Sequence, residues 1–226
     1  MAPALSIVMP VLDEAADIDA TLDALQAYRA SGTELIVVDG GSRDRTLAAC
    51  AGRADAVIAA PRGRALQMNA GAAVARAPVL LFLHADTRLP PGADALVRDG
   101  LHTTGRRWGR FDVAIDGRSA WLAVVAWMMN QRSRWSGIAT GDQAIFVTRE
   151  AFDAAGGFPP QPLMEDVELS ARLRRQGLPL CLRECVRTSG RRWDQHGVWR
   201  TIVLMWRLRL LYWLGVSPER LARAYR

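Results

Sequence analysis

The chain has 226 residues, half of them hydrophobic and 23% charged, which is the length and composition of one globular domain and not of a disordered chain. All 29 basic residues are arginine, and against 23 acids they give a net charge of +6. The absence of lysine excludes a lysine nucleophile, a Schiff base and the phosphate-binding lysine of a P-loop.

Short apolar runs and helical patterns alternate through the first hundred residues. Leu5–Val11 is the first predicted strand, and Asp13 is expected to cap a helix whose Ile18, Leu22 and Leu25 follow helical spacing. The elements predicted next are a strand over Leu35–Val38, a helix over Thr46–Arg53, a strand over Ala56–Ala59, a helix over Leu66–Ala75 and a strand over Val79–Leu83. This alternation predicts an α/β fold with a mostly parallel central sheet and helices on both faces.

The second half is less regular, and no repeat or linker divides the chain. The predicted strands are Trp108–Ile115, Ala144–Thr148, Leu180–Leu182 and Val186–Thr188. The predicted helices are Ala120–Asn130, Asp166–Gln176, Val198–Leu214 and Pro218–Tyr225.

Acidic residues follow three of the predicted strands of the first half. Asp13 and Glu14 come after the first strand, Asp39 after the second, and Asp86 after Val79–Leu83. Because ligands of such sheets bind beyond the carboxyl ends of the strands, we interpret this acidic rim as functional. The carboxylate of Asp39, beside a Gly-Gly turn, can accept a hydrogen bond from a ribose hydroxyl or a base N–H.

The sequence contains neither of the common glycine-rich phosphate loops. A bound diphosphate would therefore need a divalent cation, and Mn²⁺ or Mg²⁺ is held by one or two acids together with the substrate's phosphates. His84 and Asp86 could meet one such ion if the segment is extended, since residues i and i+2 of a strand point the same way. The alternative is a turn at the end of a strand with a hydrogen-bonded histidine.

Glu165 and Asp166 stand at the start of a predicted helix, where acids also serve as caps. A carboxylate at this position near the rim could instead accept a proton from an incoming hydroxyl.

The charge pattern argues against nucleic acid as a partner, because the arginines are spread along the chain without an aromatic-interleaved basic run. Three irregularly spaced cysteines fit neither a disulfide framework nor a zinc site. The Met1–Leu12 segment lacks a signal-peptide pattern, and the longest uncharged run, 119–131, is too short for a bilayer, so we expect a cytoplasmic protein.

The predicted helix over Val198–Leu214 is apolar on two sides, with arginines between them. One side should cover the core. The other could meet a second subunit in a homodimer, the inner face of the membrane as a peripheral contact, or an apolar acceptor; it could also be buried under Pro218–Tyr225.

Five ordered motifs resemble the family 2 glycosyltransferases, which have the GT-A (Rossmann-like) fold. They are SIVMPVLDEA, LIVVDGGSRDRT, RGRALQMNAGAAVARAPVLLFLHADT, GDQAIFVTREAFDAAGGFP and PLMEDVELSARLRRQG, and together they run nearly end to end. Within the family, GRALQMNAG, LFLHADT and NQRSRWSGIATGDQ are similar to a small soluble bacterial subgroup described as transferase 2 associated with radical-SAM or seleno-domain proteins. The resemblance implies one domain over residues 1–226, with a nucleotide-sugar half (1–100), an acceptor and catalytic half (101–190) and C-terminal apolar helices (191–226).

The resemblance also implies roles for single residues on the donor side. Pro10, Asp13 and Glu14 match the motif that lies over the nucleoside, and Asp39 matches the acid that recognises the base, usually uracil. Two further residues match positions near the donor phosphates and sugar, Arg64 and Asn69.

Other matches concern the metal and the reaction. Asp86 matches the last acid of the D-x-D metal motif, whose first acid is replaced by His84 in this chain. Asp166 matches the catalytic base of an E-D pair that begins with Glu165. The loop that lines the sugar and acceptor side is matched by Gly141, Asp142 and Gln143.

These roles imply a metal-dependent, inverting glycosyltransferase. Its donor would be a nucleotide sugar, and the resemblance favours a UDP-sugar. Its acceptor would be either a small metabolite or a lipid-linked molecule. The replacement of an acid by His84 keeps open a noncatalytic module that binds nucleotide sugars or a membrane surface. A related nucleotidyltransferase is a further alternative, although such enzymes would be expected to have a glycine-rich, basic first loop.

Overall fold

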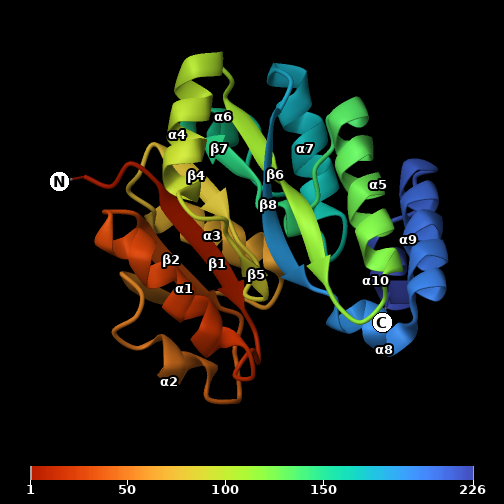
Figure 1. Ribbon diagram of the computed structural model, residues 1–226, viewed down its shortest axis with the longest axis horizontal. Coiled ribbons are helices and arrows are strands. Elements are labelled where there is room, and N and C mark those ends of the chain that lie inside the picture. Colours follow the sequence, from red (N-terminus) through yellow and green to blue (C-terminus); the bar gives the residue numbers. More distant parts are fainter. Residues whose placement is uncertain (1, 226) are drawn as a thin grey trace.

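A mixed sheet forms the centre of the computed structural model, which describes residues 2–225 (Figure 1). Within these residues the sheet has eight strands in the order β3-β2-β1-β4-β7-β6-β8-β5. Pairing is parallel among β1 to β4 and between β6 and β8, whereas β7 is antiparallel to both of its neighbours and β5 is antiparallel to β8. The predicted α/β class is confirmed.

The first half follows the predicted alternation. Its elements are β1 (Ser6–Val11), α1 (Ile18–Ala30), β2 (Glu34–Asp39), α2 (Thr46–Cys50), β3 (Ala56–Ala59), α3 (Arg64–Val74), β4 (Val79–Phe82), β5 (Thr87–Arg88) and α4 (Ala93–Thr104). Both β5 and α4 lie in a stretch for which the sequence analysis predicts no element.

The second half contains the predicted strands and helices and several short helices besides. Its elements are β6 (Trp108–Asp116), α5 (Trp121–Ser136), the 3-10 turn η1 (Gly141–Gln143), β7 (Phe146–Thr148), α6 (Arg149–Ala154), α7 (Glu165–Gln176), β8 (Leu180–Ser189), α8 (Arg191–His196), α9 (Val198–Trp213) and α10 (Pro218–Tyr225). The two short strands expected after α7 are one strand, β8, whose pairing with β6 shifts register between Phe111 and Asp112.

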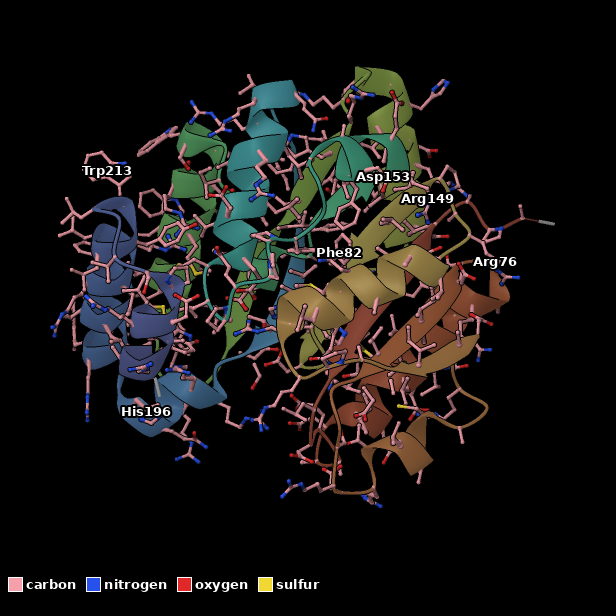
Figure 2. The ribbon with its side chains drawn as sticks, turned by 180° about the vertical axis from the view of Figure 1, so that it is seen from behind. Arg76, Phe82, Arg149, Asp153, His196 and Trp213 are labelled. Carbon is pink, nitrogen blue, oxygen red and sulfur yellow. The ribbon has the colours of Figure 1, made fainter. Side chains whose placement is uncertain are left out.

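Helices cover both faces of the sheet, as the alternation predicts. Alternate residues of β1 and β2 pack against α1 and α4 on the face toward the viewer in Figure 1, where Ile7, Met9 and Val37 are buried. Val8 and Ile36 face the other way, toward α3, α6 and α7, which lie in front of the sheet in the reverse view (Figure 2). Since both faces are buried, the parallel strands read as continuous apolar runs.

The expected cap of the first helix is wrong. Asp17 precedes α1 as its N-cap residue and makes no side-chain cap bond, and the helix starts at Ile18. The carboxylate of Asp13 instead accepts a hydrogen bond from the backbone N–H of Arg43, at 2.7 Å. Asp13 is therefore a link between two loops at the rim of the sheet.

Glu34 is a buried acid at the end of the sheet opposite the acidic rim, where it joins several segments. Glu34 accepts hydrogen bonds from the hydroxyl of Ser6 (2.6 Å) and from the backbone N–H and Nε of Arg76 (2.8 and 2.6 Å). Burial by itself raises the pKa of Glu34, but these hydrogen bonds and the guanidinium outweigh it, so that the pKa is lowered. The carboxylate thereby joins β1, β2 and the segment that leads into β4.

We expect Glu34→Gln to lower the free energy of unfolding near pH 7 by about 1.5–3 kcal/mol, because charge-assisted hydrogen bonds are lost in a buried place. An acid with a lowered folded-state pKa stabilises the fold above its ordinary value of 4.5, and this stabilisation is lost as the pH falls through the lowered pKa. Denaturant unfolding between pH 7 and pH 3 should thus show a smaller acid-induced loss in the variant. Glu184→Gln, at an exposed position, is the control, and equal pH dependence in Glu34→Gln and wild type would contradict the assignment.

Candidate functional site

Two loops at the carboxyl ends of β1 and β2 are joined by hydrogen bonds. The backbone N–H of Asp13 donates to Ser42 Oγ (3.0 Å), and that of Glu14 donates to Thr46 Oγ1 (2.8 Å). Asp13 has a left-handed backbone (φ 53°), an uncommon conformation for a non-glycine residue. The first part of the acidic rim is therefore a preformed pair of loops.

Asp39 is buried beneath its own turn. Its carboxylate accepts hydrogen bonds from the backbone N–H groups of Gly41 and Ser42. Under the turn, Gln67 of α3 donates to the carbonyls of Val11 and Val38, both at 2.8 Å. Gln67 was not among the site residues predicted from the sequence, although it is a polar residue on an apolar helix face within RGRALQMNAG.

A cavity of about 550 Å³, called the central cavity below, opens beside this rim. It brings together six of the predicted site residues, Arg64, His84, Asp86, Asp142, Glu165 and Asp166. They come from four places in the chain, namely α3, the β4–β5 turn, η1 and α7. The residues that do not line it are Pro10, Asp13, Glu14, Asp39, Asn69, Gly141 and Gln143.

His84 and Asp86 lie in a turn and not on an extended segment, since the N–H of Thr87 donates to the carbonyl of His84 at 3.1 Å. The His84 ring faces η1, with Nδ1 3.4 Å from Asp142 Oδ1. Burial opposes protonation of His84, but the contact with Asp142 and the charge of Asp86 outweigh it, and the pKa of His84 is raised. The pKa of Asp142 is correspondingly lowered: burial raises it, and the histidine more than compensates.

Glu165 and Arg64 form a second opposite-charge pair, with Oε1 3.6 Å from Nε. Glu165 is only 4% exposed. Burial raises its pKa, the adjacent charge of Asp166 raises it further, and Arg64 opposes both. Arg64 in turn has a raised pKa: burial lowers it, and Glu165 and Asp166 overcome that effect.

Asp166 lies at the first turn of α7 and is less buried than Glu165. Its Oδ2 accepts a hydrogen bond from the N–H of Gly141 at 2.7 Å, which ties the carboxylate to η1. Met164, the residue before Glu165, has a left-handed backbone (φ 64°). Such strain at a non-glycine residue is typical of functional sites, and here it lies next to the acid pair.

Three predicted residues are buried or hydrogen-bonded away from the central cavity. Asn69 bonds both backbone groups of Phe158, donating to its carbonyl (2.8 Å) and accepting from its N–H (2.9 Å). Gln143 is fully buried and accepts from the N–H of Thr140 at 3.2 Å. Pro10 is a buried residue of β1 opposite Val38.

The C-terminal region reaches the rim through Arg191 of α8. Its guanidinium lies 2.7 Å from Asp17 and 3.8 Å from Glu14. Burial raises the pKa of Glu14, Arg191 lowers it, and Asp86 raises it. Glu14 is therefore electrostatically coupled to Asp86, although it lies outside the lining of the cavity.

The donor set for a metal ion is small. Among residues 2–225, no three His, Cys, Asp or Glu side chains converge as a complete site. Asp86 lines the cavity, and within residues 2–225 its carboxylate accepts one side-chain hydrogen bond, a long one of 3.3 Å from the hydroxyl of Thr87. One open carboxylate suits an ion that takes its remaining ligands from substrate phosphates and water, as Mg²⁺ and Mn²⁺ do. His84 fits this role less well, because its Nδ1 faces Asp142.

Comparison with known proteins gives one family. The sequence pattern described as Glycosyl transferase family 2 matches residues 6–151. Among curated proteins, no sequence matches the chain.

Several solved structures share the fold. The mannosyltransferase PcManGT from Pyrobaculum calidifontis, in complex with GDP-Man and Mn²⁺, has a TM-score of 0.70 at 18% identity over 100% of this chain and 69% of its own. TarS (residues 1–349) of S. aureus with UDP gives 0.66 at 13% identity, over 82% and 60%. Glucosyl-3-phosphoglycerate synthase from Mycobacterium tuberculosis, with Mn²⁺, UDP and glucosyl-3-phosphoglycerate, gives 0.60 at 18%, over 83% and 70%.

The chain thus spans about three fifths of the TarS fragment 1–349 and somewhat more of the other two proteins. Identities below 20% establish the shared GT-A fold alone. None of the helices in residues 2–225 is long and apolar enough to cross a bilayer.

We expect Gly141→Ala to lower the free energy of unfolding by about 1–3 kcal/mol, because a Cβ at this position would lie 2.5 Å from His84 Cε1 and Nε2. Thermal unfolding of Gly141→Ala, His84→Ala and the double variant measures this. In the His84→Ala background the clash is gone and the cost should fall toward zero. An equal cost in both backgrounds would mean that His84 does not pack on Gly141.

Proposed function

The chain belongs to glycosyl transferase family 2, and from this premise we propose that it transfers a sugar from a nucleotide-sugar donor, a UDP-sugar, to an acceptor hydroxyl with inversion. The observation that carries the proposal is the central cavity, which gathers Asp86, Arg64 and Asp166 from three distant segments. An open carboxylate, a guanidinium and a second carboxylate are the groups that a displacement at a diphosphate-activated carbon requires.

On the donor side, Asp86 would hold a divalent cation, Mn²⁺ or Mg²⁺, that neutralises the charge of the leaving diphosphate when bound. Arg64 lines the same cavity and is paired with Glu165. The nucleoside would lie over the joined rim loops, against the residues that carry that role in the resemblance, Pro10, Asp13, Glu14 and Asp39. Residues 1–100 would thereby form the nucleotide-sugar half.

On the acceptor side, Asp166 would remove the proton from the attacking hydroxyl. The new bond joins that oxygen to the anomeric carbon, while the bond from this carbon to the diphosphate oxygen breaks and the nucleoside diphosphate leaves with the electron pair. The N–H of Gly141 fixes Oδ2 of Asp166, so the carboxylate keeps one direction toward the cavity. Asp142 and Gln143 complete the turn that supports the carboxylate of Asp166. Asn69 would act indirectly, because its hydrogen bond joins α3 to the loop before α7.

Residues 101–190 would select the acceptor, and residues 191–226 would close the cavity. Arg192, Trp193, Trp206 and Tyr225 of the C-terminal region all line it. This placement favours an enzyme over a noncatalytic binding module, since acidic and basic groups converge in one partly closed cavity. A nucleotidyltransferase is disfavoured by the acidic first loop, which has no glycine-rich sequence.

We expect nucleotide sugars, UDP-sugars foremost, to raise the thermal midpoint of the wild-type protein more strongly with Mn²⁺ than without it. Asp86→Asn should remove the metal-dependent part of the shift and of UDP affinity. Asp166→Asn should keep the shift and reduce transfer by about 100-fold or more, because only proton removal is lost. Calorimetry with UDP and a donor-consumption assay provide the two measurements.

Glu150→Gln, at an exposed position paired with Arg107 on the surface, is the matched control and should leave donor binding and transfer unchanged. Unchanged UDP affinity in Asp86→Asn would remove Asp86 as the metal ligand. Turnover near wild type in Asp166→Asn would remove Asp166 as the base, and no thermal shift with any donor would favour the binding-module alternative.

A second part of the proposal concerns the aromatic face, the surface of α5 and α9 formed by Trp121, Trp127, Trp135, Trp199, Trp206 and Trp213. These are six of the eight tryptophans, and each is more than half exposed. The face lies at one end of the molecule, and Trp213 stands at its outer limit (Figure 2). Monomeric proteins rarely expose apolar surface of this extent.

We propose that the aromatic face rests on an anionic membrane surface. Tryptophan prefers the membrane–water interface, and arginine is attracted by anionic headgroups. Arg200 and Arg207 are exposed on α9 among these tryptophans, and the whole chain carries a charge of +6. A second copy of the chain would instead bring equal charges together.

We expect the wild-type protein to float with vesicles of phosphatidylcholine and phosphatidylglycerol. The double variant Trp135→Ser/Trp213→Ser should reduce the bound fraction by about tenfold or more, because two interfacial anchors are lost. Neither residue lines the central cavity. Val57→Ser, on β3 at the opposite edge of the sheet, is the control. A stable dimer that ignores vesicles and dissociates in the double variant would assign the face to a second copy.

A further inference from the structure

One wall of the central cavity is apolar, and a nucleotide sugar does not account for it. α5 contributes Met128 and Met129, and α9 contributes Ile202, Met205 and Trp206. Sugars and diphosphates are polar, whereas methionine and tryptophan side chains bind apolar groups. The wall therefore has room for a ligand portion that is itself apolar.

Arg132 of α5 enters the same cavity as a cation without a partner. Its Nε and Nη2 atoms are buried, and neither has a hydrogen-bond partner among residues 2–225. No carboxylate of the described chain lies within ion-pair distance of it. Burial lowers its pKa, Asp166 and Asp142 oppose this effect, and Arg110 adds to it. An uncompensated buried guanidinium destabilises a fold, so its presence needs a reason.

The other arginines of the cavity differ from Arg132. Arg64 has Glu165 as a partner, and Arg192 donates to the carbonyl of Tyr225 (2.7 Å) and stacks on its ring. Arg209 of α9 lines the cavity and, within the described residues, forms no ion pair. Arg132 and Arg209 thus have neither a carboxylate partner nor a side-chain hydrogen bond within residues 2–225, and they come from the two helices that supply the apolar wall.

The position of Arg132 indicates the acceptor side. Arg132 follows Met128 of the apolar wall by one turn of α5 and lines the same cavity as Asp166, the proposed base, which must contact the acceptor. An anion bound at Arg132 would consequently share the cavity with the reacting hydroxyl.

Resting on the function proposed above, we propose that the acceptor is an anionic amphiphile, a phosphate ester whose phosphate binds Arg132 and whose apolar chain lies between α5 and α9. Guanidinium suits the task because its forked N–H groups meet two phosphate oxygens at once. The bound phosphate would supply the missing partners of Nε and Nη2. Arg209, which lines the same cavity, would add a second positive charge.

The test uses octyl phosphate as the probe, with inorganic phosphate and octyl glucoside as probes that lack the chain or the charge. In calorimetry with UDP and Mn²⁺ present, wild type should bind octyl phosphate at least tenfold more tightly than either control probe. Arg132→Gln should lose this preference by tenfold or more and keep its UDP affinity. Arg98→Gln, which removes the same charge from an exposed position of α4 outside the cavity, should behave as wild type.

Thermal unfolding separates a binding role from a structural one. Removal of an unpaired buried charge should maintain or raise the thermal midpoint, so Arg132→Gln and Arg132→Met are expected to be at least as stable as wild type. A large loss of stability in both variants would overturn the assignment. So would equal binding of octyl phosphate and octyl glucoside, or a loss of UDP affinity in Arg132→Gln, which would place the arginine on the donor side.

Vesicle flotation distinguishes the two sources of the phosphate, a lipid headgroup and a soluble ester. If it is a lipid headgroup, Arg132→Gln should weaken flotation with phosphatidic acid vesicles relative to phosphatidylcholine vesicles; if it is a soluble ester, flotation stays equal while octyl phosphate binding is lost. Either result supports the subsite. Failure of UDP to bind wild type would refute the proposed function, whereas normal UDP binding without octyl phosphate binding would refute this inference alone.

Discussion

The central constraint on this molecule is that ionised groups in a partly closed cavity need partners of opposite charge. Arg64 is paired with Glu165, and His84 with Asp142. Both pairs are internal to the protein. Asp86, Asp166, Arg132 and Arg209 line the same cavity, form no ion pair within residues 2–225 and are available to ligands. The pairing inside the protein thus leaves both acidic and basic side chains for the substrate, while Glu165 holds Arg64 in place.

Backbone geometry holds the available groups in place. Met164 adopts a left-handed conformation just before the acid pair of α7, and the N–H of Gly141 anchors Asp166. Gly141 also permits the close approach of the His84 ring, which a Cβ would block. A single glycine therefore connects the histidine of the β4–β5 turn to the proposed base, although the two lie far apart in the sequence.

The C-terminal helices serve the cavity and the surface together. Trp206 lines the cavity and is also part of the aromatic face. A ligand with an apolar chain could extend from the cavity toward that face without leaving apolar surroundings. The lysine-free, arginine-rich composition is consistent with this arrangement, because guanidinium retains its charge at apolar boundaries and binds phosphate in a forked geometry.

The helices and strands that could be predicted from the sequence are those with a clear pattern over neighbouring residues. Buried parallel strands such as Leu35–Val38 are continuous apolar runs, the alternation with helices identifies the α/β class, and the ordered motifs identify the family. The acids at the strand ends were found in the same way. The helices α4, α6 and α8 and the strand β5 were not predicted.

Which of the candidate residues lie close together is known only from the tertiary structure. Asn69 is bonded to Phe158, Asp13 joins two loops instead of capping a helix, and His84 turns toward Asp142 instead of pointing the same way as Asp86. Arg132 was one arginine among 29 until its unpaired guanidinium was placed in the central cavity. The reason is physical: charge pairing and burial depend on distances between segments far apart in the chain, and no local pattern encodes them.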